Sequence, residues 1–411
     1  MKIIWIFQTG EPLHVDGFDS RPMRAMNLAN FFVKKKIKVV LWSSDFYHQK
    51  KVHRTKTFKS IKINTYLTIQ LIPSLGYSKN ISFKRIFDHI LLALNLRKIL
   101  KKNKYETPNF LIIGCPPIES SFVFLKWAQK NNIRTILDIK DQWPEVFISP
   151  FPKYLKFFVR LLLQPYFIIL RYQIRNADYI STISGGFQNW IDTLNSNKDK
   201  NKNLLVPLTS PLVAIKKSKY NNIFKWWNKN GLVKGKKTIC FVGSLSRAFD
   251  FKPIHKLVEY LSSMNLDINF VICGSGEKNV HIKKMMKKYD NVFFPGWINF
   301  EQIKVLYDNS YFMLAPYKNF EDFKLSIPNK VYDALSNGLP ILTSLEGEVK
   351  QLIDKYEVGI HYQNEIDLCL KFHKILSSDN IRDNMSVNAK KLFNKNYNFD
   401  LVYNKFLEII D

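Results

Sequence analysis

Apolar residues along the chain fall into two kinds of run. Short continuous runs rich in Ile, Val and Phe predict buried strands, and runs in which apolar residues recur every three or four positions predict helices. In the first half of the chain the two kinds alternate, which predicts a parallel sheet covered by helices. Strands are expected at residues 2–8, 39–43, 110–114, 134–139 and 180–184, and helices at residues 22–36, 120–129 and from 185 onward.

The second half of the chain repeats this alternation. Strands are expected at residues 238–242, 268–273, 291–294, 312–315 and from 341, and helices at 253–261, from 328 and towards the chain end. Charged residues gather between the two halves, at 198–202 and 216–237. Because 411 residues exceed one ordinary core, we predict two domains, 1–215 and 216–390, and a helical segment at 391–411. Open parallel sheets bind ligands at the carboxyl ends of their strands, so a cleft between the domains is expected.

Two segments of the first half, residues 81–104 and 154–175, are both strongly apolar and strongly basic. Charged residues and Pro165 interrupt them, so neither is expected to span a bilayer. One interpretation is a helix that lies in a membrane interface, where apolar burial and attraction to anionic lipid act together. The other is a long core helix of an α/β domain, which the residues 154–175 favour when taken alone. Two such segments in one domain strengthen the membrane interpretation.

The composition narrows the partners and the compartment. The net charge of +28 indicates an anionic partner, which is a nucleic acid, an acidic membrane surface or a phosphorylated substrate. The apolar run at residues 2–8 is too short for a signal peptide. Scattered cysteines without a CxxC pair predict structural thiols in a reducing compartment and no zinc site. These cysteines are Cys115, Cys240, Cys273 and Cys369.

The stretch from Leu325 to Pro340 is the first candidate for ligand binding. Ser326 is expected to cap a helix with Pro328 in its first turn, and the free N–H groups at such a helix start suit a phosphate. Asp333, one turn further along, could accept hydrogen bonds from sugar hydroxyls. A capped surface helix with no ligand is an equally good interpretation of this stretch alone.

Two glycine turns follow predicted strands of the same half. Gly243 begins a turn that contains Arg247, whose guanidinium can fork onto phosphate oxygens. The triplet Gly274-Ser275-Gly276 follows the next strand. Neither turn forms a GxGxxG fingerprint, which weakens an NAD-binding interpretation. With the turn at Ser326, three such turns are predicted to converge at one sheet edge.

In the first half, acids and bases follow the strand predicted at 134–139. Asp138, Lys140, Asp141 and Glu145 are candidates for catalysis, because closely spaced carboxylates at a strand end can shift one another's pKa. In the competing interpretation Asp141 caps the next helix and Trp143 packs in the core. Side chains expected to face the same cleft from the region after the first strand are Glu11, His14 and Arg24.

Several motifs follow one another at a defined spacing. In the second half they are Gly243 to Arg247, Gly274-Ser275-Gly276, Val292 to Gly296 and Ser326 to Pro340. In the first half they are Gly10-Glu11-Pro12-Leu13, Arg21-Pro22-Met23-Arg24, Asp138 to Glu145 and Ile183-Ser184 with Trp190. The second-half set resembles the donor domain of family 4 retaining glycosyltransferases of the GT-B fold. The first-half set resembles a branch of that family encoded in surface-polysaccharide pathways, and the resemblance covers nearly the whole chain.

The resemblance implies a GT-B fold, with two Rossmann-like α/β/α domains, a cleft between them, and C-terminal helices that pack back toward the N-terminal domain. It implies that Asp333 binds the ribose hydroxyls, and that Arg247 and Lys330 neutralise the donor diphosphate. It further implies donor contacts at the base, sugar and phosphates from Gly243, Gly274, Gly276, Gly296, Trp297, Ser326 and Ile327. The chain departs from the family at Leu325, where relatives carry a glutamate, and at Lys140-Asp141, where many carry a histidine.

The activity that the resemblance implies is transfer of a sugar from a UDP-linked donor, with retention, to a saccharide or lipid-linked saccharide. The pathway would be capsule, O-antigen or other surface-polysaccharide synthesis. The nucleotide-sugar is a substrate, so neither a cofactor nor a metal is expected. The expected location is the cytoplasm, peripherally on the inner face of an anionic membrane. Two alternatives stay open: a GT-B sugar-nucleotide epimerase, and a basic nucleic-acid-binding protein, for which no recognisable motif is present, so that no nucleic-acid partner is expected.

Overall fold

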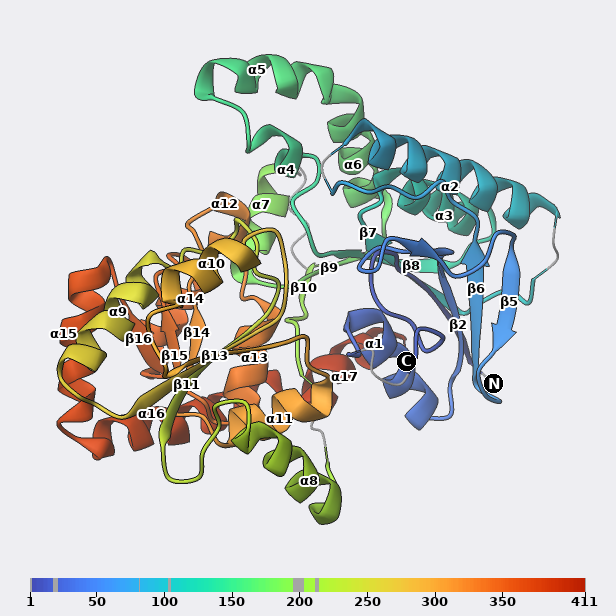
Figure 1. Cartoon of the computed structure of the whole chain (residues 1–411). Helices are drawn as coiled ribbons and strands as arrows, with labels where there is room; N and C mark the ends of the chain where they lie inside the picture. The colour runs from blue at the N-terminus through green and yellow to red at the C-terminus, as the bar shows by residue number, and fades with distance from the viewer. Residues whose placement is uncertain are drawn as a thin grey trace. The chain divides into compact units, whose positions relative to one another are not determined.

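The computed structural model describes residues 2–17, 21–80, 82–102, 105–194, 203–210 and 214–410 (Figure 1). The ends of the predicted segment 81–104 and the charged run 198–202 lie outside the described residues. The chain divides into two compact units, which are Met1–Pro207 with Tyr403–Asp411, and Leu208–Val402. Each unit is built on a largely parallel sheet between helices, so the predicted fold class is confirmed.

Unit 1 contains an eight-stranded sheet in the order β10-β9-β8-β7-β1-β2-β6-β5. All neighbouring strands are parallel except β5, which pairs antiparallel with β6. The strands are β1 (Ile3–Phe7), β2 (Lys38–Ser44), β5 (Lys59–Lys62), β6 (Leu67–Ile72), β7 (Phe110–Cys115), β8 (Arg134–Ile139), β9 (Tyr179–Thr182) and β10 (Asn203–Leu205). After β2 the chain forms a small hairpin of β3 (Phe46–Tyr47) and β4 (Val52–His53).

Helices cover both faces of the unit 1 sheet. Helix α3 packs between α2 and α6 on one face, and α1 lies on the other with the end of α17 (Figure 1). The helices are α1 (Arg24–Lys34), α2 (Phe83–Lys102), α3 (Ile118–Lys130), α4 (Glu145–Ile148), α5 (Lys153–Leu162), α6 (Gln164–Asn176), α7 (Gly185–Leu194) and α17 (Phe399–Ile410). Lys2 Nζ donates to the Ile410 carbonyl at 3.4 Å, and the rings of Phe31 and Tyr403 lie 5.9 Å apart. The last residues of the chain therefore belong to the N-terminal unit, as predicted.

Unit 2 contains a six-stranded, fully parallel sheet in the order β13-β12-β11-β14-β15-β16. Its side chains alternate between two cores, with Ile239 and Phe241 in one and Cys240 in the other. The strands are β11 (Lys237–Val242), β12 (Ile268–Cys273), β13 (Val292–Gly296), β14 (Phe312–Ala315), β15 (Ile341–Thr343) and β16 (Gly359–His361).

The helices of unit 2 form two layers. Helices α9 (Lys252–Ser263), α10 (Asn279–Met286) and α15 (Glu365–Leu376) contribute to one core. The other core is formed mainly by α8 (Lys217–Asn228), α11 (Phe300–Asp308), α13 (Asn329–Ser336), α14 (Glu348–Tyr356) and α16 (Asp379–Leu392). A short helix, α12 (Glu321–Lys324), precedes α13, and a π-helical turn, η2 (Phe393–Tyr397), follows α16.

The segment 154–175 differs from the single core helix that its residues favour. It forms two helices, because Pro165 lies in the first turn of α6 and cannot donate the hydrogen bond that would continue α5. Helix α6 buries Phe167, Leu170 and Ile174, whereas α5 buries no residue at all. The prediction of a core helix is therefore wrong for α5. Among the described residues no helix combines the length and the apolar character needed to cross a bilayer.

Candidate functional site

Backbone hydrogen bonds join the chain segments that follow β11, β12 and β13 at the carboxyl edge of the unit 2 sheet. The Gly243 N–H donates to the Cys273 carbonyl at 3.1 Å, and the Gly274 N–H donates to the Gly296 carbonyl at 2.7 Å. Gly274 has a φ of +120°, and a Cβ there would lie 1.9 Å from the Gly243 carbonyl oxygen. No residue with a side chain could hold this backbone contact, so glycine at 274 fixes the spacing of two loops. The predicted turns at Gly243 and Gly274 therefore meet at one edge, where the end of β13 at Gly296 joins them.

Lys330 lies at the centre of this edge, in the first turn of α13. Its Nζ is 4.1 Å from the ring centroid of Phe249 and 4.3 Å from that of Phe241, which hold the side chain by cation–π contact. A Cβ at Gly243 would lie 2.7 Å from the same Nζ. Gly243 therefore leaves the room that the ammonium group occupies. A fixed cation thus stands beside the positive end of a helix, which suits an anionic ligand.

Ser326 is placed differently from the prediction. Residues 321–324 form α12, and the Ser326 hydroxyl donates to the Asp322 carbonyl at 3.2 Å, at the end of that helix. Helix α13 begins at Asn329 with Pro328 in its N-cap position and no side-chain cap. The prediction that Ser326 caps this helix is therefore wrong. Ile327 is buried next to it, so the backbone of this turn, rather than the Ser326 hydroxyl, is fixed at the start of α13.

The remaining predicted donor residues differ in exposure. Asp333 is 5% exposed, one turn into α13. Arg247 is exposed and forms an ion pair with Glu277, with Nε 3.6 Å from the carboxylate. Gly296 ends β13 with a φ of +82°, and Trp297, which follows it, is 75% exposed. A large exposed ring at a strand end is available to stack on a flat ligand.

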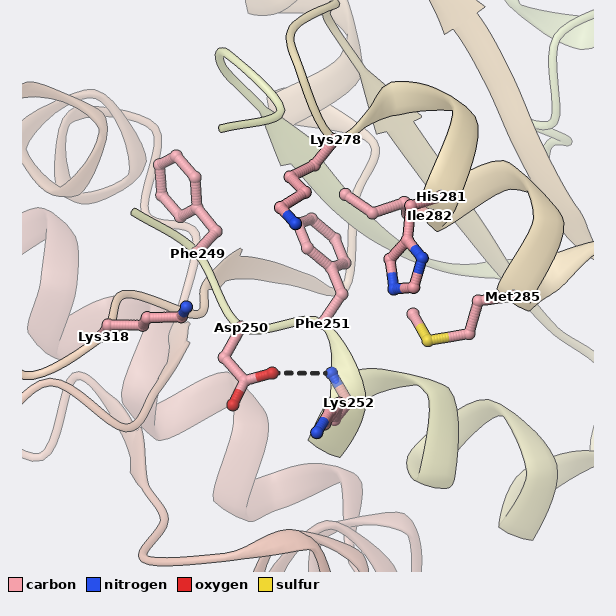
Figure 2. Close-up of a pocket in the computed structure, with 9 residues that line it drawn as sticks. All are labelled: Phe249, Asp250, Phe251, Lys252, Lys278, His281, Ile282, Met285 and Lys318. Carbon is pink, nitrogen blue, oxygen red and sulfur yellow. Dashed lines mark hydrogen bonds between the residues drawn. The ribbon is translucent and has the colours of Figure 1, made fainter. Parts of the chain in front are cut away.

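Three lysines that the sequence analysis did not single out line a pocket of about 140 Å³ at this end of unit 2 (Figure 2). They are Lys252, at the start of α9, Lys278, which precedes α10, and Lys318, which follows β14. Phe249 lies between the pocket and Lys330, because Phe249 lines the pocket and its ring contacts the Lys330 ammonium group. Each of these lysines follows one of three neighbouring strands, a pattern that could have predicted the pocket. The pattern does not stand out because the sequence contains many other lysines.

In unit 1, Glu11 and Lys140 form an ion pair between the loop after β1 and the loop after β8. The second oxygen of Glu11 accepts a hydrogen bond from the Ala25 N–H at 2.8 Å, in the first turn of α1, which has no other side-chain cap. Glu11 therefore caps a helix and fixes a lysine at once. His14 instead lies against α1, with Nε2 2.8 Å from the Asn30 side-chain oxygen.

A second pair, between Arg24 and Asp138, is fully buried. Arg24 donates from Nε and Nη2 to the two Asp138 oxygens, each at 2.7 Å, and the Ser181 hydroxyl donates to Asp138 at 2.6 Å. Burial alone would raise the pKa of Asp138, but the charge of Arg24 and these hydrogen bonds lower it below its ordinary value. Both oxygens of Asp138 are occupied by protein groups, which favours a positioning role for Asp138 over contact with a substrate.

Asp141 and Glu145 complete the predicted first-domain set. Asp141 is exposed just beyond the end of β8, beside the Lys140–Glu11 pair. Glu145 lies in α4, 3.5 Å from the Arg160 guanidinium of α5, and its burial raises its pKa. Of the predicted carboxylates, Asp141 is therefore the one placed to meet a ligand at the carboxyl edge of this sheet.

Residues 222–392 match the family described as glycosyl transferases group 1. The sequence has no match among curated proteins.

Several solved structures share the fold of the chain. Sucrose-phosphate synthase from Thermosynechococcus elongatus is similar over 100% of this chain and 98% of its own, with a TM-score of 0.73 and 13% identity. HepE from Anabaena, in complex with UDP, is similar over 100% and 99%, with a TM-score of 0.63 and 10% identity. WaaG, a glycosyltransferase involved in lipopolysaccharide biosynthesis, is similar over 99% of both chains, with a TM-score of 0.63 and 12% identity. The chain thus shares the GT-B fold of these structures, and its residues 222–392 match the glycosyl transferases group 1 family.

Proposed function

We propose that the chain transfers a sugar, with retention of configuration, from a UDP-linked donor to a lipid-linked saccharide in surface-polysaccharide synthesis. The observation that carries the donor half is the position of Lys330. Its ammonium group is held by aromatic rings beside Gly243, at the start of α13 and at the carboxyl ends of the unit 2 strands. That is where a leaving diphosphate would gain most from a fixed positive charge.

Lys330 and the N-terminal N–H groups of α13 would stabilise the charge that develops on the departing nucleoside diphosphate. The lysines of the neighbouring pocket, Lys252, Lys278 and Lys318, would add to the positive potential. Asp333 would bind the ribose, and Trp297 would contact the base, in keeping with the family resemblance. Asp141 would position the acceptor hydroxyl, while Lys140 and Glu11 hold the loop that carries it. Retention of configuration rests on the resemblance alone.

We expect a nucleoside diphosphate to raise the unfolding temperature of the protein. A ligand that binds only the native state adds about 2.7 kcal/mol at 100 times its dissociation constant. The measurement is a thermal-shift panel with UDP, GDP, ADP and CDP, with inorganic phosphate at the same ionic strength as the control. UDP should give the largest shift. Equal shifts for UDP and phosphate, or none for any nucleotide, would contradict the proposal.

Helix α5 of unit 1 supports the proposal that the acceptor is lipid-linked. Tyr154, Phe157, Phe158, Leu161 and Leu162 recur at helical spacing, and each is between 59% and 78% exposed. Such a stripe normally faces a core, so its exposure calls for a partner. The helix also carries three basic residues and no acidic one. An apolar stripe bordered by cations suits the interface of an anionic bilayer.

Helix α2 presents a second exposed apolar stripe in the same unit. Phe83 is 81% exposed and Phe87 is 62% exposed, and the stripe continues one and two turns further. The opposite side of α2 is buried, mainly against α3, so the helix is apolar on two sides. The residues of the exposed stripe are Phe83, Phe87, Ile90, Leu91 and Leu94.

We expect the protein to sediment with phosphatidylglycerol vesicles at low salt, and less so at high salt, where the charges are screened. Leu162→Asp should reduce the bound fraction about ten-fold or more, because it removes a leucine that would insert into the bilayer and adds a charge of the wrong sign. Leu370→Asp is the matched control, since Leu370 is a similarly exposed leucine, on α15 of unit 2. The membrane role fails if the two variants behave alike, or if the unmodified protein stays in the supernatant.

A further inference from the structure

A pair of cations lies on one tyrosine ring at the carboxyl edge of the unit 1 sheet. Lys51 Nζ is 4.6 Å from the Tyr77 ring centroid, and the Arg85 guanidinium is 5.4 Å from it. Arg85 also stacks on Trp143 at 4.9 Å. Lys51 comes from the β3–β4 hairpin, Tyr77 from the loop after β6, and Arg85 from the first turn of α2. The fold thus brings the charge of the β3–β4 hairpin together with the charge at the start of α2.

Neutral groups hold both cations in place. Lys51 Nζ donates to the side-chain oxygen of Asn80 at 2.6 Å, and Arg85 Nη1 donates to the Asn80 carbonyl at 2.8 Å. His48 Nδ1 lies 2.7 Å from the Tyr77 hydroxyl and 3.2 Å from Lys51 Nζ. Burial, followed by the charges of Lys51 and Arg85, lowers the pKa of His48 to about 4, so this histidine is neutral at pH 7.

The pair lacks the carboxylate partner that comparable cations of unit 1 possess. Arg24, Arg54 and Lys140 are all paired, with Asp138, Asp16 and Glu11 in that order. Within the described residues, neither Lys51 nor Arg85 has a carboxylate oxygen within 4.0 Å. The mutual repulsion is visible at Lys51, since burial and the charge of Arg85 lower its pKa to about 8.

Two carboxylates in the surroundings, Asp88 and Glu119, are engaged by other groups, and Asp141 lies near enough for its charge to interact with that of Arg85. Asp88 accepts the Gly76 N–H at 2.6 Å, and Glu119 accepts the Tyr166 hydroxyl at 2.8 Å. Burial raises the pKa of both acids. Two cations held at fixed positions, with no carboxylate in direct contact, form a site of positive potential that suits an anionic ligand.

We propose that Lys51 and Arg85 form a subsite for the phosphate or diphosphate group of the acceptor. An arginine fork and a lysine point charge together match a group with several charged oxygens better than a single carboxylate. The exposed stripe of α2 begins two residues away at Phe83, so a lipid chain attached to the phosphate could follow it. This inference rests on the proposed transfer to a lipid-linked saccharide, and it names the chemical group by which that acceptor is held.

The test is calorimetric titration of the full chain with inorganic pyrophosphate. Arg85→Gln and Lys51→Met should each raise the dissociation constant of one site at least about ten-fold. This is the change expected when one charge-assisted hydrogen bond is lost. The matched controls are Lys84→Gln and Lys50→Met, which remove exposed charges directly adjacent in sequence. They should change the constant less than about two-fold, as expected for screened surface charges. Equal losses in all four variants, or none in the first two, would overturn the inference.

Further titrations separate this site from the donor site and name the ligand. Pyrophosphate binding near Lys330 should be lost in Lys330→Met and kept in Arg85→Gln. The two sites are therefore tested by different variants, and a failure of the donor proposal does not affect the result at Lys51 and Arg85. Geranyl diphosphate should bind more tightly than pyrophosphate, because its apolar chain reaches the stripe on α2. Glucuronate binding as tightly as pyrophosphate would indicate a carboxylate site instead and refute the proposal.

The source of the phosphate is tested with vesicles and kinetics. If the site serves the acceptor, Arg85→Gln should leave sedimentation with phosphatidylglycerol vesicles unchanged, and should raise the KM for a diphosphate-linked acceptor without changing the KM for the donor. If Arg85→Gln instead abolishes sedimentation as Leu162→Asp does, the anion is a bilayer headgroup and the acceptor assignment is wrong. Lys51→Met, on a separate segment, repeats each measurement should Arg85→Gln lower the unfolding temperature.

Discussion

Replacing Lys330 by methionine should lower turnover of the nucleotide-sugar about 100-fold to 1,000-fold, with a smaller effect on donor binding. Removing one preorganised group that stabilises developing charge costs about 2.7 to 4 kcal/mol in the transition state. Methionine keeps an unbranched apolar side chain against Phe241, Phe249 and Tyr317, so packing between these rings is retained and the charge alone is lost. The measurement is kcat and KM for donor hydrolysis and for transfer.

The control for Lys330 is a lysine that also rests on an aromatic ring but lies away from the strand ends. Lys355 on α14 meets this condition, with Nζ 5.3 Å from the ring centroid of Tyr356. Lys355→Met should leave kcat unchanged. Arginine at position 330 should restore part of the lost turnover if charge is what matters. The assignment of Lys330 to the leaving diphosphate would fall if Lys330→Met retained more than about half of the original kcat.

Breaking the Arg24–Asp138 pair should destabilise the protein by about 3 to 5 kcal/mol, because either substitution leaves one buried charge without its partner. Asp138→Asn keeps the shape and removes the charge, whereas Arg24→Leu also removes the hydrogen bonds to the carbonyls of Val206 and Pro207. The measurement is chemical denaturation of the full chain, read from the transition of unit 1. Lys38→Ala, which breaks a more exposed ion pair with Glu106, should cost less than about 1 kcal/mol.

The same pair predicts how stability depends on pH. The pKa of Asp138 is lowered in the folded state, so its ionisation contributes stability above its ordinary value of 3.8, and that contribution is lost as the pH falls below it. Asp138→Asn should therefore flatten the acid limb of the stability curve below pH 4. An unchanged acid limb, or a loss of stability no greater than in Lys38→Ala, would show that the pair does not hold unit 1 together.

Much of the fold could be predicted from the sequence because buried parallel strands are continuous apolar runs. The strands at 134–139, 268–273 and 312–315 have the predicted boundaries. Strand β5 was missed, because Lys59–Lys62 is half lysine and its position at the sheet edge demands little burial. Strand β16 has only three residues, too few for any periodicity.

The parts of the candidate site in which glycine fixes the backbone could be predicted from the sequence. The parts in which a side chain is paired with a residue distant in sequence could not. Gly243 and Gly274 directly follow predicted strands, and the convergence of such turns at one sheet edge is what favours a ligand site. Nothing local to Asp138 indicates that Arg24, 114 residues away, occupies both of its oxygens. For the same reason nothing in the sequence pairs Lys51 with Arg85 among 62 basic residues, since only the folded chain places them on one tyrosine.

The two units cannot be completed in the order in which they are synthesised on the ribosome. Unit 1 is formed by Met1–Pro207 with Tyr403–Asp411, and unit 2 by Leu208–Val402. Residues 208–402 can fold as soon as they emerge, because all of unit 2 is then available. Unit 1 begins to emerge first but lacks residues 403–410, including the Ile410 carbonyl that accepts from Lys2, until that segment has been synthesised. The first unit to be made is therefore the last to be completed, and a nascent chain stalled before residue 403 would expose the surface of α1 that Tyr403 covers.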